Sequence, residues 1–111
     1  MTSPESLAKN EALYRRVNEQ IETLNDRIPR HEATTEFLCE CERQGCFEKV
    51  IATRAEYESV RAVSTHFLVH RGHVDPRIEH VAFANDRFAV VEKEGEAASV
   101  AREENPRRPE A

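Results

Sequence analysis

The chain has 111 residues, a length that suits one small domain; 33% of them are charged and 39% are hydrophobic. Its formal net charge of −5 argues against general nucleic-acid binding, which depends on basic contacts to phosphate. The longest apolar runs, residues 81–84 and 88–91, fall far short of the roughly 20 residues that a membrane-spanning helix needs. The first residues contain no basic and apolar signal segment, so we expect a cytoplasmic protein that does not enter a membrane.

Residues 1–30 carry a heptad pattern that predicts a long amphipathic helix. One set of positions recurs every seven residues and a second set follows three residues later: Leu7, Tyr14, Ile21 and Ile28, then Asn10, Val17 and Leu24. Ser3 and Pro4 suit the start of the helix, and Pro29 ends it. We expect this helix either to lie on its own domain or to associate with a second copy as a coiled coil.

Residues 31–93 predict a small core of the α+β class, built around an antiparallel sheet. Strands are expected at residues 35–41, 47–52 and 66–70, the first two joined by a polar turn at residues 42–45. A hairpin formed by residues 81–84 and 87–92 would turn at Asn85 and Asp86.

One or two short helical segments accompany this sheet. Thr53 and Glu56 form a capping-box pair, so a short helix should run through Val63 and bury Tyr57 and Val60. An Asp-Pro pair at residues 75–76 signals a further helical turn. Residues 94–111 predict a short helical or disordered charged tail, with disorder from residue 103 onward. The core has few large apolar side chains, so we expect a metal ion to stabilise it.

The cysteines form a C-x-C-x4-C cluster at Cys39, Cys41 and Cys46. An odd number of cysteines and a cytosolic environment argue against a disulfide framework. Cys39 and Cys41 would project to the same face of a strand, and Gly45 permits a turn that returns Cys46 towards them. Three converging thiolates suit Zn²⁺, which prefers soft sulfur ligands in a tetrahedron, and iron takes similar donors. Inert buried thiols and redox-active thiols are the alternatives.

A fourth ligand must come from elsewhere in the chain. Histidines are available at five positions: His31, His66, His70, His73 and His80. We favour His73, because Gly72 before it lets the loop approach closely, with His70, water, a carboxylate or another histidine as the alternatives. A site of three cysteines and one histidine has no open position and is therefore structural.

Residues 37–41 and 46–48 resemble a group of small bacterial proteins with a C-E-C-x4-C signature. The likeness continues through residues 56–61, 72–76 and 90–93 and covers roughly residues 10–104. It implies that Cys39, Cys41, Cys46 and His73 belong together. The group has no established activity, so the resemblance implies nothing about the role.

These features favour a small cytoplasmic interaction or regulatory protein with a structural zinc site. Its partner would be another protein, or a second copy bound through the N-terminal helix. An acidic surround of the cysteines would suit a basic partner; it consists of Glu36, Glu40, Glu42 and Glu48. A thiol-based redox or metal sensor and a nucleic-acid-binding zinc module are the alternatives. The chain has no metalloprotease, nucleotide-binding or serine-hydrolase motif, so we assign no catalytic residue and expect no enzyme.

Overall fold

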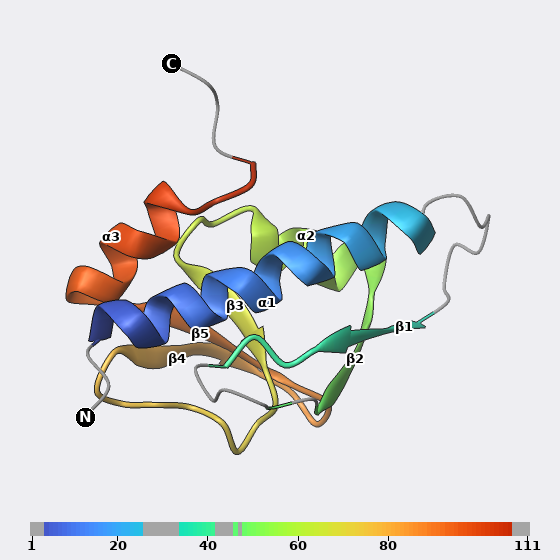
Figure 1. The fold of residues 1–111 in the computed structure, drawn as a ribbon. Helices are drawn as coiled ribbons and strands as arrows, with labels where there is room; N and C mark the ends of the chain where they lie inside the picture. Colours follow the sequence, from blue (N-terminus) through green and yellow to red (C-terminus); the bar gives the residue numbers. More distant parts are fainter. Residues whose placement is uncertain (1–3, 26–33, 42–45, 47, 108–111) are drawn as a thin grey trace.

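The computed structural model describes residues 4–25, 34–41, 46 and 48–107, with side chains on the first helix at Lys9 and from Glu11 to Leu24. Three helices and five strands follow one another (Figure 1): α1 (Pro4–Asn25), β1 (Thr34–Leu38), β2 (Lys49–Thr53), α2 (Arg54–Arg61), β3 (His66–Val69), β4 (Glu79–Ala84), β5 (Ala89–Lys93) and α3 (Gly95–Glu103). β1 and β2 form one antiparallel pair, and β3, β5 and β4 form a three-stranded antiparallel sheet in that order. The predicted mixture of helices and small antiparallel sheets is confirmed.

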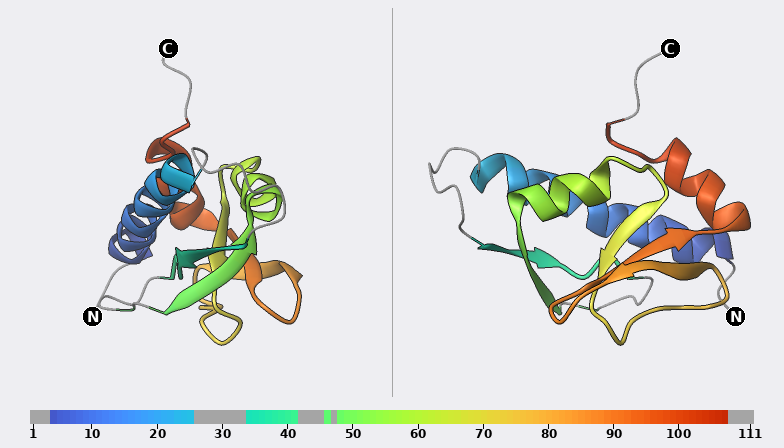
Figure 2. Two further views of the ribbon diagram at one scale, coloured as in Figure 1. Left: turned by 90° about the vertical axis from the view of Figure 1, so that its right-hand side faces the viewer. Right: turned by 180° about the vertical axis from the view of Figure 1, so that it is seen from behind.

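The helices enclose the three-stranded sheet from two sides. Figure 2 shows β3 lying between α1 and α2. On the α1 side, the guanidinium of Arg15 lies 4.3 Å from the centre of the Phe67 ring. On the other side, α2 buries Val60 towards the sheet and Tyr57 against Phe37, whose rings stack 4.4 Å apart. No helix in the described part of the chain has the length and apolar content that a membrane crossing requires.

Several local predictions are confirmed. Thr53 and Glu56 make both hydrogen bonds of the capping box at the start of α2. β4 and β5 form the expected hairpin, and the side chain of Asn85 accepts hydrogen bonds from the amides of Arg87 and Phe88 in the turn. α2 ends at Arg61, however, so Val63 lies beyond the helix and is exposed.

The predicted first strand is too long. β1 ends at Leu38, which is paired in register with Lys49 and whose backbone amide and carbonyl bond to the side chain of Asn18 on α1. The predicted turn at residues 42–45 lies outside the described residues, as do Ile28 and Pro29.

The amphipathic heptad helix is not confirmed, because α1 buries a polar face. The four polar residues that share this face follow the helical spacing of four, three and four: Glu11, Arg15, Asn18 and Glu22. Among the predicted apolar positions, Leu24 is 63% exposed and Val17 is 38% exposed, while Tyr14 and Ile21 are half-buried. The helix lies on its own domain, as one of the two expectations stated, but through a polar face beside the heptad stripe, of which Tyr14 and Ile21 are partly covered.

A buried ionic cluster joins this face to the sheet. The ammonium of Lys93 bonds to the carboxylates of Glu11 and Glu79, and all three side chains are fully buried. Burial raises the pKa of Glu11 to about 9, so this carboxyl is protonated at neutral pH. Lys93 and Glu79 are then a balanced pair of charges, which keeps the net charge of the buried cluster at zero.

The C-terminal segment is more ordered than predicted. α3 occupies residues 95–103, and Arg107 beyond it pairs with Glu19, Glu22 and Glu58. The expectation of disorder from residue 103 is therefore wrong as far as Arg107, because this arginine bridges α1 and α2. Residues 108–111 lie outside the described part.

The pKa of Glu11 gives a prediction for pH dependence. Between pH 4.5 and about 9 the folded protein keeps the Glu11 proton and the unfolded chain releases it, so stability falls as pH rises through this window. Glu11→Gln cannot titrate at this position. As pH rises through this window, the unfolding free energy of the variant minus that of the wild type should therefore increase by up to about 1.4 kcal/mol per pH unit.

Chemical denaturation of both proteins at several pH values measures this difference. Glu96→Gln, at an exposed position on α3, is the control and should follow the wild type. Parallel curves for Glu11→Gln and the wild type would contradict the raised pKa.

Candidate metal centre

The end of β1 places Cys39 and Cys41 on one side of the chain. The Cys39 amide donates to the Glu48 carbonyl at 2.9 Å, which extends the pairing of β1 with β2 by one residue. Glu40 between the two cysteines points the other way and is fully buried. The strand-like alternation that the sequence predicted is therefore present, although β1 itself ends at Leu38.

Glu40 and Asn18 fix this segment from behind. Asn18 donates through its Nδ2 to the Leu38 carbonyl and to Glu40 Oε2, both at 2.8 Å, and its Oδ1 accepts from the Leu38 amide at 2.7 Å. Glu40 Oε1 accepts from the Leu68 amide at 2.9 Å, and the Glu40 amide donates to the Leu68 carbonyl at 2.7 Å. The cysteine-bearing segment is thus bonded to both α1 and β3.

His73 comes from the connection between β3 and β4. Its amide donates to the His70 carbonyl at 2.9 Å, and further along the connection the Asp75 amide donates to Glu79 Oε2 at 2.9 Å. A Cβ atom on Gly72 would meet its nearest neighbour at 3.8 Å, an ordinary contact. The predicted role of Gly72 in allowing a close approach is therefore wrong, and hydrogen bonds shape this loop instead.

The four predicted side chains converge. The sulfur atoms of Cys39, Cys41 and Cys46 and a ring nitrogen of His73 all lie within 4.8 Å of one another. His73 Nδ1 lies 3.4 Å from Cys39 Sγ and 3.6 Å from Cys46 Sγ. Cys39 and Cys41 are buried, whereas Cys46 and His73 are half-buried. This group could bind a metal ion.

The distances from the His73 nitrogen to two of the sulfurs fit a tetrahedral ion. With Zn–S bonds of about 2.3 Å and Zn–N bonds of about 2.0 Å, tetrahedral angles place neighbouring sulfurs about 3.8 Å apart and sulfur about 3.5 Å from nitrogen. The two sulfur–nitrogen distances at His73 match this value closely. The amide of His70 also donates to Cys39 Sγ at 3.1 Å, a bond that stabilises a thiolate.

Without a cation, the surroundings favour the protonated thiols. Hydrogen bonding to Cys41 and burial hold the pKa of Cys39 well above its usual value, against the opposite effect of the His70 amide. Burial is also the main cause that raises the pKa of Cys46. A bound divalent ion reverses this preference, because a coordinating thiol is deprotonated outright.

The other histidines of the described residues do not join the group. His70 is exposed, and its Nδ1 accepts a hydrogen bond from the Gly72 amide at 3.3 Å. His66 and His80 lie on the three-stranded sheet beside Glu92. His31 is outside the described residues. Of the histidines in the described residues, the geometry therefore selects His73.

The structure confirms only part of the acidic surface that the sequence predicts around the cysteines. Glu36 and Glu48 are exposed, Glu42 is not among the described residues, and Glu40 is buried in hydrogen bonds to Asn18 and Leu68. Glu40 is a positioning residue for the cysteines rather than part of a surface that could meet a basic partner.

Sequence reasoning missed Asn18 as the other positioning residue. It belongs to the polar series of four on α1, whose spacing is visible in the sequence but is the same as that of a solvated helix face. Comparisons of this chain with known protein families, with curated proteins and with solved structures found no match.

The position of Asn18 behind the cysteines predicts a linked effect. Asn18→Ala should lower the unfolding free energy by about 1–3 kcal/mol for each buried group left without a partner. It should also weaken metal binding, because the Leu38 backbone and Glu40 are no longer fixed beside Cys39.

Competition with a chromophoric chelator measures metal affinity, and chemical denaturation measures stability. Gln20→Ala, two residues away and exposed on the same helix, is the matched control and should change neither. A variant that loses stability but keeps wild-type metal affinity would show that Asn18 does not position the ligands.

Proposed function

We propose that this chain is a small cytoplasmic interaction protein whose fold is held by a structural zinc ion bound to Cys39, Cys41, Cys46 and His73. The observation that carries the proposal is the convergence of three thiols and one imidazole within 4.8 Å. Four protein donors fill a tetrahedron and leave no position for water or substrate, as in structural rather than catalytic zinc sites.

The place of the site in the fold supports a structural role. Cys39 and Cys41 follow β1, Cys46 precedes β2, and His73 lies between β3 and β4. An ion at this point ties the two-stranded sheet to the three-stranded sheet. A domain of this size gains little stability from its apolar core alone, whereas structural zinc contributes on the order of 10–16 kcal/mol in small modules.

The donor chemistry supports zinc over harder ions. Thiolates select zinc, copper(I) or iron–sulfur chemistry, while calcium and magnesium take oxygen ligands. Three sulfurs with one imidazole form one of the common structural zinc donor sets. The same convergence supports kinship with the small bacterial proteins that share the C-E-C-x4-C signature.

The outward face of α1 supports contact with another protein. Leu13, Val17 and Leu24 are exposed on it, and Leu13 reaches 57% exposure. This stripe lies opposite the polar face that α1 buries in its own domain, so the helix has apolar surface left for a partner. A symmetrical coiled coil with a second copy is less well supported, because Ile21, one of its seam positions, packs against the core of its own domain.

Metal content tests the proposal directly. The freshly purified, reduced protein should contain about one zinc per chain and no iron, as measured by elemental analysis. Protein without metal and with three freely titratable thiols would refute the zinc site; one iron per chain would change the identity of the ion and leave the site in place.

Removal of the ion should unfold the protein. Cys41→Ser should sharply lower the thermal transition, and His73→Ala should do so more mildly, because water can occupy the vacated position. A chelator should lower the wild-type transition to that of Cys41→Ser. His70→Ala, which removes a neighbouring imidazole outside the group, is the matched control. An unchanged transition in wild-type protein that has demonstrably lost its zinc would exclude a structural role.

A further inference from the structure

The three-stranded sheet has one covered edge and one open edge. At β3, the Glu40 backbone and side chain bond to both the amide and the carbonyl of Leu68. At the other edge, β4 pairs with β5, and no other strand of the described residues pairs with it. Backbone donors and acceptors along the outer side of β4 are therefore available to an added strand.

This open edge is apolar on both faces. Val81 pairs with Val91 and Phe83 with Val90, and because neighbouring residues of β5 point to opposite faces, Val81 and Phe83 do so too. Val81 is 47% exposed and Phe83 is 55% exposed. Residues 81–84 carry no charge and no proline, two of the features that usually protect an edge strand. A third such feature, an irregularity of the pairing, is present at Ala82, where the register with β5 shifts.

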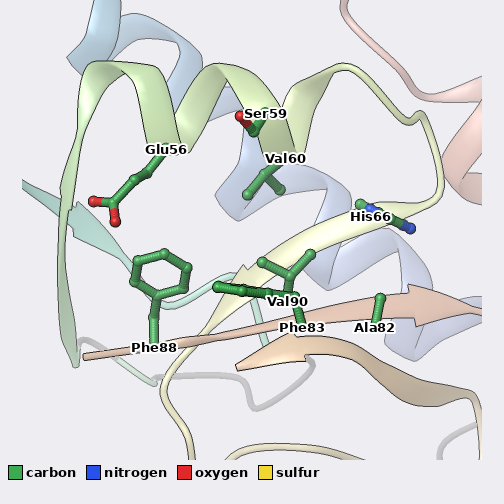
Figure 3. A pocket seen from close by; sticks show the side chains of 8 residues that line it. All are labelled: Glu56, Ser59, Val60, His66, Ala82, Phe83, Phe88 and Val90. Atoms are coloured by element: carbon green, nitrogen blue, oxygen red, sulfur yellow. The ribbon is translucent and has the colours of Figure 1, made fainter. Parts of the chain in front are cut away.

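A groove continues from this edge under α2. It has a volume of about 340 Å³ and lies between α2 and the β4–β5 hairpin (Figure 3). Its apolar lining consists of Val60, Ala82, Phe83, Phe88 and Val90, with three polar residues, Glu56, Ser59 and His66, completing it. The Glu56 carboxylate is engaged by the guanidinium of Arg87, so the groove offers no unpaired acidic group from α2.

We propose that a second copy of this chain binds here, with its own β4 laid antiparallel along the first. Val81 and Phe83 face opposite sides of the sheet, so an occupant that covers both must extend the sheet; a helix docked on one face would cover only one of them. The two sheets would then form one continuous sheet about a two-fold axis.

The charges around β4 permit a second copy to pair with this strand. Like residues meet across a two-fold axis, and a strand without charges at residues 81–84 brings no like charges together. The neighbouring His80 is already paired with Glu92 and Glu94. On the groove side, an axis beside Phe83 brings the two Phe83 rings together and joins the two grooves into one covered apolar cavity.

Sedimentation of the full zinc-loaded chain over a range of concentrations tests this arrangement. The wild type should be a dimer that dissociates on dilution. Phe83→Glu should raise the dissociation constant about 100-fold, because it places two carboxylates side by side across the axis. Val81→Lys, on the opposite face, should also raise the dissociation constant, because strand pairing would bury the new ammonium on that face.

Leu24→Glu is the matched control, an equally exposed apolar residue replaced by the same carboxylate on α1. It should leave the dimer intact. Circular dichroism and zinc content should match the wild type in all three variants, which separates dissociation from misfolding.

Three results would overturn the proposal. The wild type could be a monomer even at millimolar concentration. Leu24→Glu could dissociate the dimer while the β4 variants do not, which would place the interface on α1. Phe83→Glu alone could dissociate it while Val81→Lys does not, which would indicate docking on the groove face without strand pairing.

Discussion

The fold depends on a helix that buries its polar face. α1 turns Glu11, Arg15, Asn18 and Glu22 inward, and the first three of them bond to four different parts of the chain. Glu11 bonds to Lys93 on β5, and Asn18 bonds to the end of β1. Arg15 donates to the carbonyls of Ser64 and Ala101, at 2.7 and 2.8 Å, and so joins α1 to the segment before β3 and to α3. Burial of such groups is unfavourable unless they are bonded, so α1 has few alternative positions on the domain.

The candidate metal centre rests on the same layer. Cys39 and Cys41 point towards His73, while Glu40 between them points towards Asn18. The candidate metal ligands and the buried polar layer therefore occupy opposite sides of one short segment after β1. A shift of α1 would therefore move the cysteine side chains through Glu40, and a shift of the cysteines would move α1 through the same bonds.

The sequence predicted best the features that depend on neighbours in the chain. The capping box at Thr53 and Glu56 and the turn at Asn85 follow from side chains that bond to backbone groups two or three residues away. The C-x-C spacing indicated two side chains on one face, and that local geometry is present.

Features that depend on distant residues were harder to predict. A polar stripe on a helix has the same spacing whether water or a buried partner satisfies it, so the heptad pattern indicated the wrong inward face for α1. Lys93, which pairs with Glu11, lies 82 residues further along the chain. Arg107 holds the end of the chain through Glu19, 88 residues away, and the local composition of the tail contains no sign of that contact.

The spacing of the ligands also bears on how the chain folds. Cys39 and His73 are separated by 34 residues, and the segment between them contains β2, α2 and β3. An ion held by both ends would close this segment into a loop, and while it stayed bound to the unfolded chain it would exclude extended conformations as a disulfide of that span does. A chain that keeps its ion when unfolded has already lost the entropy of this loop closure before it refolds. The three elements inside the loop then start close together and need to move only short distances to make contact.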